Sequence, residues 1–65
     1  MINEGIYVVI TGDRTDELLQ ARLFSDWMVV TKNETKMVVC VTDAPTISRI
    51  KAMGYSEVIG LLGLD

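Results

Sequence analysis

The sequence predicts one small α/β domain in which four strands and two helices follow one another in the order β-α-β-β-α-β. The chain has 65 residues, of which 49% are hydrophobic, so residues 1–65 suffice for one core and one domain. The segments 6–10 and 37–41 are continuously apolar and rich in valine and isoleucine, as strands buried on both faces are. Two other segments open with residues that favour helix starts. These observations together predict a four-stranded sheet with two helices.

In the first half of the chain we expect a strand, a helix and a second strand. Gly5–Ile10 is a β-branched and aromatic block without polar alternation, which predicts a strand in the centre of the sheet. Thr15 precedes two acidic residues, so it is expected to cap a helix that runs to about Phe24. Trp27–Thr31 is the next segment with a high β propensity.

In the second half of the chain we expect a strand, a helix and a short final strand. The polar tetrad Lys32–Thr35 separates the second strand from a third, which begins at Lys36 or Met37 and ends at Val41. Pro45 suits the first turn of a helix, because its missing N–H would have no partner there. Gly54 is a natural residue to follow the end of that helix, and Glu57–Ile59 is a short final strand.

Two sheet architectures fit this order of elements. In a compact parallel sheet, the tetrad Lys32–Thr35 begins a crossing connection, whereas in a ferredoxin-like sheet it forms an antiparallel hairpin. The continuously apolar strands favour the parallel sheet, because the antiparallel one has a wetter face. The shortness of the tetrad favours the hairpin, since parallel neighbours need longer crossovers. We take the parallel sheet as the prediction and the ferredoxin-like α+β fold as the alternative.

Charge and cysteine content exclude several classes of function. A net charge of −3 and a pI near 4.6 oppose nonspecific attraction to nucleic acids or anionic membranes. One cysteine and no histidine leave no disulfide framework, no usual metal site and no histidine-based catalytic triad. Cys40 lies in an apolar run and is expected to be a buried hydrophobe in a reducing compartment. We therefore expect a cytoplasmic protein that is not an enzyme, does not bind membranes, and needs no cofactor or metal.

Three stretches of the chain resemble the BRCT domain, a module of bacterial NAD-dependent DNA ligases and of many DNA-repair and checkpoint proteins. Val8–Gly12 resembles the first strand of that family and its Thr-Gly turn. Val30–Val39 resembles a short second strand, a polar turn and an apolar third strand, and Thr46–Gly54 with Val58–Ile59 resembles the second helix and the last strand. The resemblance implies a parallel four-stranded sheet in which the first strand separates the second from the third.

The sequence departs from the BRCT pattern in two places. Phe24–Ser25 stands where the family commonly has a Gly-Gly turn. The third helix of the family is missing, because the sequence stops at Asp65. The resemblance therefore implies a minimal BRCT domain, with part of one sheet face left uncovered.

The same resemblance implies a phosphate-binding site. In the phosphate-binding members, the first turn and a basic residue of the second helix surround the anion, and the matching residues are Thr11, Gly12 and either Arg49 or Lys51. A hydroxyl, a turn amide and a cation are suitable ligands for an anion. Asp13 opposes this interpretation, because its carboxylate would repel a phosphate. The alternative is that Thr11 and Gly12 form the tight exit of a strand, where glycine supplies conformational freedom.

Large apolar side chains outside the expected core are candidates for a protein interface. They are Trp27, Leu61, Leu62 and Leu64. Aromatic and aliphatic anchors of this kind form the centres of many interfaces. The alternative places the tryptophan against the core and folds the leucines back as a last helical turn.

Two functions from different classes are expected. The first is a noncatalytic BRCT-like interaction module that binds a partner protein, a phosphorylated peptide or a phosphorylated DNA end in DNA replication or repair. The second is a small phage or mobile-element regulator that inhibits a host enzyme by protein–protein contact. A homodimer, formed through the uncovered sheet face or the leucines of the tail, is a third expectation.

Overall fold

The structure is a computed structural model and describes residues 4–62. A single 3-10 turn, η1, precedes the first helix, and the remaining elements follow in the predicted order. The elements are β1 (Glu4–Ile10), η1 (Gly12–Arg14), α1 (Thr15–Gln20), β2 (Asp26–Lys32), β3 (Thr35–Asp43), α2 (Ala44–Ala52) and β4 (Val58–Leu62).

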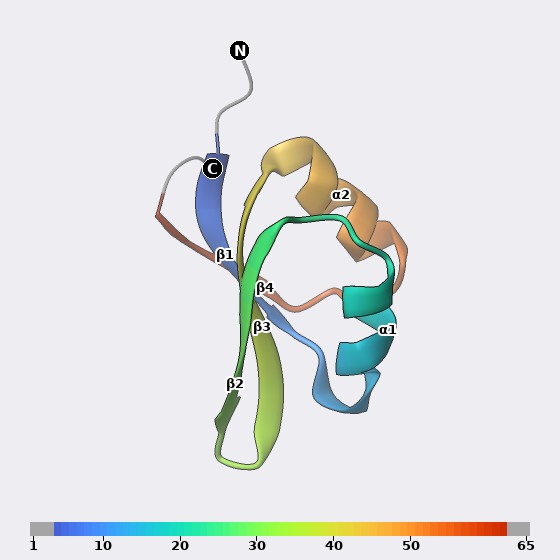
Figure 1. Ribbon diagram of the computed structural model, residues 1–65, viewed down its shortest axis with the longest axis vertical. Coiled ribbons are helices and arrows are strands. Elements are labelled where there is room, and N and C mark those ends of the chain that lie inside the picture. The colour runs from blue at the N-terminus through green and yellow to red at the C-terminus, as the bar shows by residue number, and fades with distance from the viewer. Residues whose placement is uncertain (1–3, 63–65) are drawn as a thin grey trace.

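The four strands form one sheet in the order β2-β3-β1-β4, and every neighbouring pair is antiparallel (Figure 1). The predicted parallel, BRCT-like sheet is therefore wrong: β2 and β3 are direct neighbours, and β1 does not separate them. Strand order and strand directions are those of the ferredoxin-like alternative, so the fold is α+β. The prediction that β1 is a central strand is confirmed, since it lies between β3 and β4.

A tight turn is the physical reason for the antiparallel sheet. Asn33 and Glu34 both have positive φ angles, 51° and 65°, as the two central residues of a type I′ hairpin turn require. This turn places Lys32 opposite Thr35, and the pairing then continues without a bulge to Asp26 opposite Val41. The turn is too short for a crossover, so its length outweighed the apolar composition of the strands.

The first helix is shorter than predicted and begins differently. It ends at Gln20 and not near Phe24, because Arg22 adopts a left-handed backbone with φ of 54°. Thr15 is the first helical residue and not the N-cap, and its hydroxyl donates to the Gly12 carbonyl oxygen at 3.0 Å. The predicted capping role of Thr15 is therefore wrong.

The second helix begins and ends as the sequence predicts. The Asp43 carboxylate accepts the Thr46 backbone N–H at 2.8 Å, and Pro45 lies in the first turn. Gly54 follows the helix with φ of 104°, a conformation that side chains with a Cβ rarely adopt.

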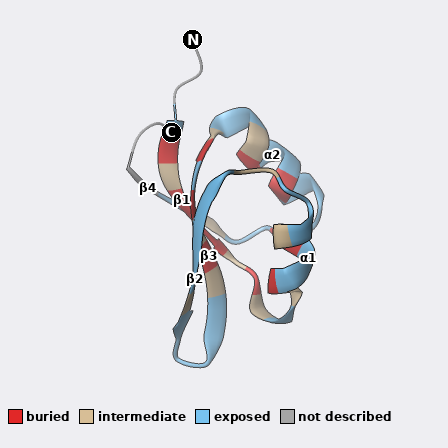
Figure 2. Cartoon of the chain, in the orientation of Figure 1, coloured by how far each residue is buried: buried red, intermediate tan, exposed pale blue. Residues whose placement is uncertain are grey.

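Both helices pack on the same side of the sheet (Figure 1), and the core lies between them and that face. The helices contribute Leu18, Ile47 and Ile50, all buried. Figure 2 shows the buried residues gathered between sheet and helices, whereas the β2–β3 turn projects away from both helices. The other members of the core are Tyr7, Val9, Val38, Cys40 and Tyr55.

The final strand extends further than predicted. It reaches Leu62, so Leu61 and Leu62 belong to a strand paired with β1 and not to a last helical turn. Leu64 lies outside the described residues. Between Ile6 and Tyr7 the pairing of β1 with β4 shifts register, which marks a bulge at this edge of the sheet.

Candidate interaction surface

Thr11 and Gly12, the predicted phosphate ligands of the first turn, lie together where β1 enters η1. The Thr11 hydroxyl is buried, lies 2.6 Å from the Thr15 hydroxyl oxygen, and donates to the Lys36 carbonyl oxygen at 3.3 Å. Gly12 has φ of 58°, which explains the glycine without any ligand. Both residues thus have structural roles in the turn that joins β1 to the first helix.

The two basic candidates, Arg49 and Lys51, are exposed in the last part of α2, and the residue that follows this helix, Met53, accepts a hydrogen bond from Arg14. An open depression beside Gly12 is lined by Asp13, Glu34 and Lys36. Two carboxylates against one ammonium group make this depression unfavourable for a phosphate. Phosphate binding at Thr11, Gly12, Arg49 and Lys51 stays a prediction.

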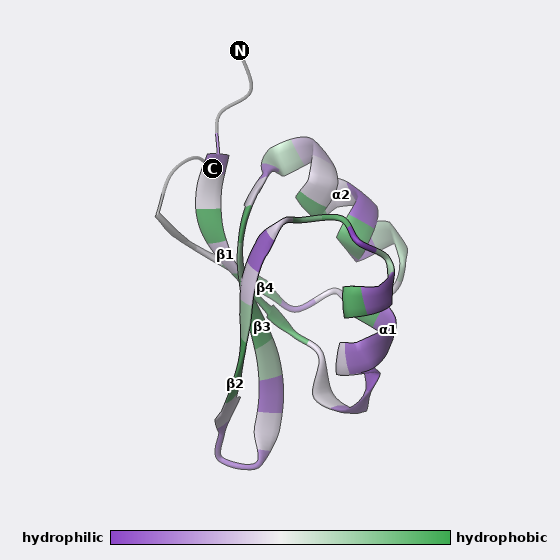
Figure 3. Cartoon of the chain, in the orientation of Figure 1, coloured by the Kyte–Doolittle hydropathy of each residue, from purple (hydrophilic) through white to green (hydrophobic). Residues whose placement is uncertain are grey.

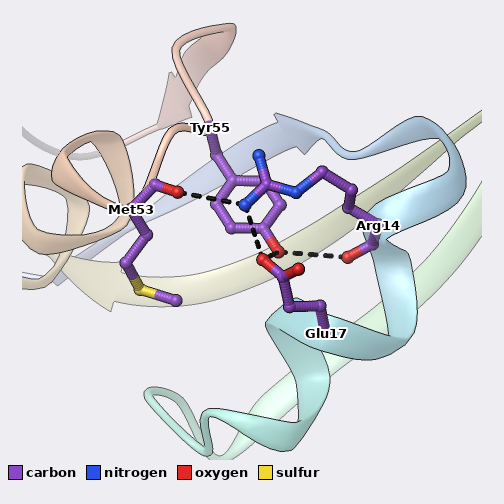
Figure 4. A network of polar contacts seen from close by, with 4 residues as sticks. All are labelled: Arg14, Glu17, Met53 and Tyr55. Carbon is purple, nitrogen blue, oxygen red and sulfur yellow. Dashed lines mark hydrogen bonds and ion pairs between the residues drawn. The ribbon is translucent and has the colours of Figure 1, made fainter.

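A polar network that joins the start of α1 to the loop after α2 is shown in Figure 4. The Arg14 guanidinium donates to the Glu17 carboxylate and to the Met53 carbonyl oxygen, and it lies 4.2 Å from the centroid of the Tyr55 ring. The Tyr55 hydroxyl donates to Glu17 Oε2 at 2.7 Å, with the Arg14 carbonyl oxygen 3.1 Å away. The hydrogen bonds from Arg14 and Tyr55 hold the pKa of Glu17 below its ordinary value. This network, the Arg14–Tyr55 clamp, fastens both helical regions together over one face.

Cys40 is buried in the core, as predicted. Its thiol points to the Tyr7 carbonyl oxygen at 3.7 Å, and burial raises the pKa of the thiol to about 11. A thiol with such a pKa stays protonated at neutral pH, so its nucleophilic thiolate is scarce.

The opposite face of the sheet, which we call the open face, has no helix over it among residues 4–62 (Figure 1). Successive side chains of a strand point to opposite faces. The open face is therefore formed by the strand residues that alternate with the core residues. Val8 pairs with Val39 on one side and Ile59 on the other, and Val39 pairs with Met28. The remaining apolar residues of the open face are Ile6, Ile10, Val30, Met37 and Val41.

The middle row of the open face is apolar from one edge of the sheet to the other, and Figure 3 shows hydrophobic residues along β1 and β3. Met28 and Ile59, at the two ends of its middle row, are 57% and 53% exposed. Val8, in the centre of that row, is only 7% exposed, because the side chains of its neighbours surround it. A continuous apolar surface of this kind is typical of a binding site for another protein.

Trp27 is the only predicted interface residue whose side chain the structure describes. It lies on β2 opposite the core residue Cys40 and is 49% exposed, so it is not enclosed in the core, and an interface role for it stays a prediction. Its neighbours Met28 and Val29 are also exposed, which leaves both faces of this edge strand open (Figure 2). For Leu61 and Leu62 the structure describes the backbone alone, and an interface role for them stays a prediction.

Comparisons of the chain with protein families, with curated proteins and with solved structures found no match. Within residues 4–62, every helix is too short or too polar to cross a membrane.

The sequence contains two signals for the cover of the sheet, and they disagree. Continuous apolar runs in 6–10 and 37–41 predict strands buried on both faces, whereas helices lie on one face only among residues 4–62. The expectation that part of a sheet face stays uncovered agrees with the structure, because two short helices cover only one face of four strands. The apolar residues at alternate positions then remain without a covering layer.

Proposed function

We propose that this chain is a noncatalytic interaction module that binds another protein through the open face of its sheet, in the cytoplasm. The observation that supports the proposal most strongly is the unbroken row Met28, Val39, Val8 and Ile59, which spans all four strands. The single cysteine with its buried thiol is suited to a reducing compartment.

The size of the open face supports a functional role. With strands about 4.8 Å apart and about 3.4 Å per residue, a sheet of this width and about six residues in length covers about 400 Å². That is comparable with the largest apolar patch of a typical monomer, which is often a functional surface. Among the described strand residues, the charged ones at open-face positions lie at strand ends: Glu4 on β1, Asp43 on β3, and Asp26 and Lys32 on β2. The centre of the face can therefore be desolvated at low cost.

The chemistry of the open face favours a protein partner over a phosphorylated peptide or DNA end. A phosphate needs several donors or cations, whereas the centre of the face offers aliphatic and methionine side chains. The partner is therefore expected to present an apolar patch of similar size, as a replication or repair protein or a host enzyme could.

An affinity capture from lysate with a matched pair of variants tests this proposal. Ile59→Lys places a charge on the open face, and Ser48→Lys places the same charge on the exposed side of α2. We expect the wild type and Ser48→Lys to retain the same stoichiometric partner and Ile59→Lys to lose it, with thermal unfolding confirming that both variants fold. Retention of that partner by Ile59→Lys, or no stoichiometric partner for the wild type, would contradict the proposal.

A second arm of the experiment addresses the phosphate site. Treatment of the lysate with phosphatase, and the double substitution Arg49→Ala with Lys51→Ala, are both expected to leave capture unchanged. Loss of capture in either case would instead support recognition of a phosphorylated partner.

A further inference from the structure

The two edges of the sheet differ in how well they are protected. At the β4 edge, the strand has five residues, contains Gly60 and is interrupted by a register shift. At the β2 edge, the strand has seven residues, lacks proline and pairs with β3 without a bulge. Short or bulged edges resist further strand pairing, whereas a long regular apolar edge invites it. The β2 edge is therefore open to another strand.

The hydrogen-bond pattern identifies which groups of β2 are unpaired within the described sheet. The Thr11 N–H donates to the Lys36 carbonyl oxygen, and the Ile10 N–H donates to the Glu57 carbonyl oxygen. Odd-numbered residues of β1 therefore direct their backbone N–H and C=O groups to β3, and even-numbered residues direct theirs to β4. In an antiparallel ladder this alternation passes from strand to strand. Through the β1–β3 and β2–β3 registers, the residues of β2 that direct their N–H and C=O groups to the free edge are Trp27, Val29 and Thr31.

We propose that a second copy of this chain pairs with the β2 edge, antiparallel and about a two-fold axis that passes between the Val29 residues of the two copies. In this register Val29 of one copy bonds Val29 of the other, and Trp27 bonds Thr31 of the second copy. Every outward-facing residue of β2 thereby gains a hydrogen-bonded partner in a continuous sheet. The proposal goes beyond the proposed function, because it uses an edge of the sheet and not the open face.

Charge complementarity supports the second copy as the occupant and selects this register. The β2 strand begins with Asp26 and ends with Lys32, both exposed. Pairing about Val29 places Asp26 opposite Lys32 of the second copy, twice per dimer, and opposite charges on facing positions stabilise a strand pair. A shift by two residues places Asp26 opposite Val30 in one direction and opposite Glu34 in the other, which loses the attraction or creates repulsion.

The exposed apolar side chains of β2 would be covered on both faces of the extended sheet. Trp27, 49% exposed, would lie beside Thr31 of the second copy and diagonal to its Val29. On the other face, Met28 would lie opposite Val30 of the second copy. Figure 1 shows that the β2–β3 hairpin extends beyond the helices, which leaves this edge accessible to a second copy.

Sedimentation velocity over a dilution series, together with Trp27 fluorescence, tests the edge pairing. Trp27 is the single tryptophan, so its emission reports directly on β2. Val29→Pro removes an outward N–H but leaves the bonds from β2 to β3, whereas Val29→Thr keeps the N–H in a side chain of similar shape. We expect the wild type and Val29→Thr to be dimeric and Val29→Pro to be monomeric and folded.

Charge-swap variants test the register. Asp26→Lys and Lys32→Asp each create facing like charges twice per dimer, and each is expected to weaken dimerisation by about tenfold. The double variant Asp26→Lys with Lys32→Asp restores the attraction and is expected to regain the wild-type dissociation constant. Equal dimerisation of the wild type and the single variants would overturn this register.

Other outcomes separate this proposal from the proposed function. A wild type that stays monomeric at all concentrations would overturn the proposed dimer. This holds also if the β2 edge of that monomer pairs with a strand of a different protein. Ile59→Lys lies at the far edge and is expected to leave the dimer intact, so a loss of partner capture with an unchanged sedimentation coefficient concerns the open face alone. Dimerisation unaffected by Val29→Pro would show that the copies meet elsewhere.

Discussion

The two faces of the sheet have similar amino-acid composition and different surroundings. The covered face presents Tyr7, Val9 and Val38 to the helices, whereas the open face presents Val8, Val39 and other aliphatic residues without a covering layer among residues 4–62. On β3, for example, Val38 is fully buried under the helices, whereas its neighbour Val39 on the open face is only half-buried. Apolar composition therefore identifies strands, and only the placement of the helices decides which side of a strand becomes core.

The largest contrast is expected from truncating a helix residue of the covered side. Leu18 is fully buried, so Leu18→Ala should lower the free energy of unfolding by about 2–5 kcal/mol. Met28→Ala on the open face should cost less than about 1 kcal/mol, because its side chain is largely exposed. Urea denaturation of both variants, at a concentration where the wild type is monomeric, measures the difference. Equal losses would mean that the open face is covered in solution.

A matched pair of neighbours on β3 sharpens the same comparison. Val38→Thr places a hydroxyl in the core and should cost about 1–3 kcal/mol, since few acceptors are available there. Val39→Thr makes the same change on the open face and should alter stability by no more than about 0.5 kcal/mol. The two midpoints of urea denaturation give the result, and a larger cost for Val39→Thr would reverse the assignment of the faces.

The smallest effects are expected at the Arg14–Tyr55 clamp, which holds the helical regions over the covered face. Tyr55→Phe removes the hydrogen bond to Glu17 but keeps the buried ring, so it should lower the free energy of unfolding by about 0.5–1.5 kcal/mol. Thermal unfolding measured alongside the wild type checks this value. A loss as large as that of Leu18→Ala would show that the hydroxyl does more than join the two helical regions.

The clamp also predicts how stability depends on pH. The pKa of Glu17 is lowered in the folded state, first by its hydrogen bond from Arg14 and then by that from Tyr55. Its contribution is therefore present above the ordinary carboxyl value of 4.5 and is lost as the pH falls through the lowered value. Asp43, whose pKa is lowered by its bonds from Thr46, acts in the same direction. Denaturation at a series of pH values should show Glu17→Gln with a shallower acid decline than the wild type.

Most elements could be predicted from the sequence because their signals are local. Asp43 and Pro45 mark the start of α2 through bonds and ring geometry within one turn, and Gly54 marks its end. The end of α1 could not be predicted, because Arg22 takes a left-handed conformation that arginine rarely adopts. The predicted interface residue Trp27 was identified by type, but its exposure depended on where the helices lie.

The sequence by itself determined the order of strands and helices, the burial of Cys40 and the hairpin-length tetrad 32–35. Only the tertiary structure decided that the sheet is antiparallel and which of its faces stays open. The physical reason is that strand propensity and helix caps act within a few residues, whereas strand direction and coverage arise from contacts between distant segments. The same apolar residues can therefore make either a buried parallel strand or an exposed binding surface.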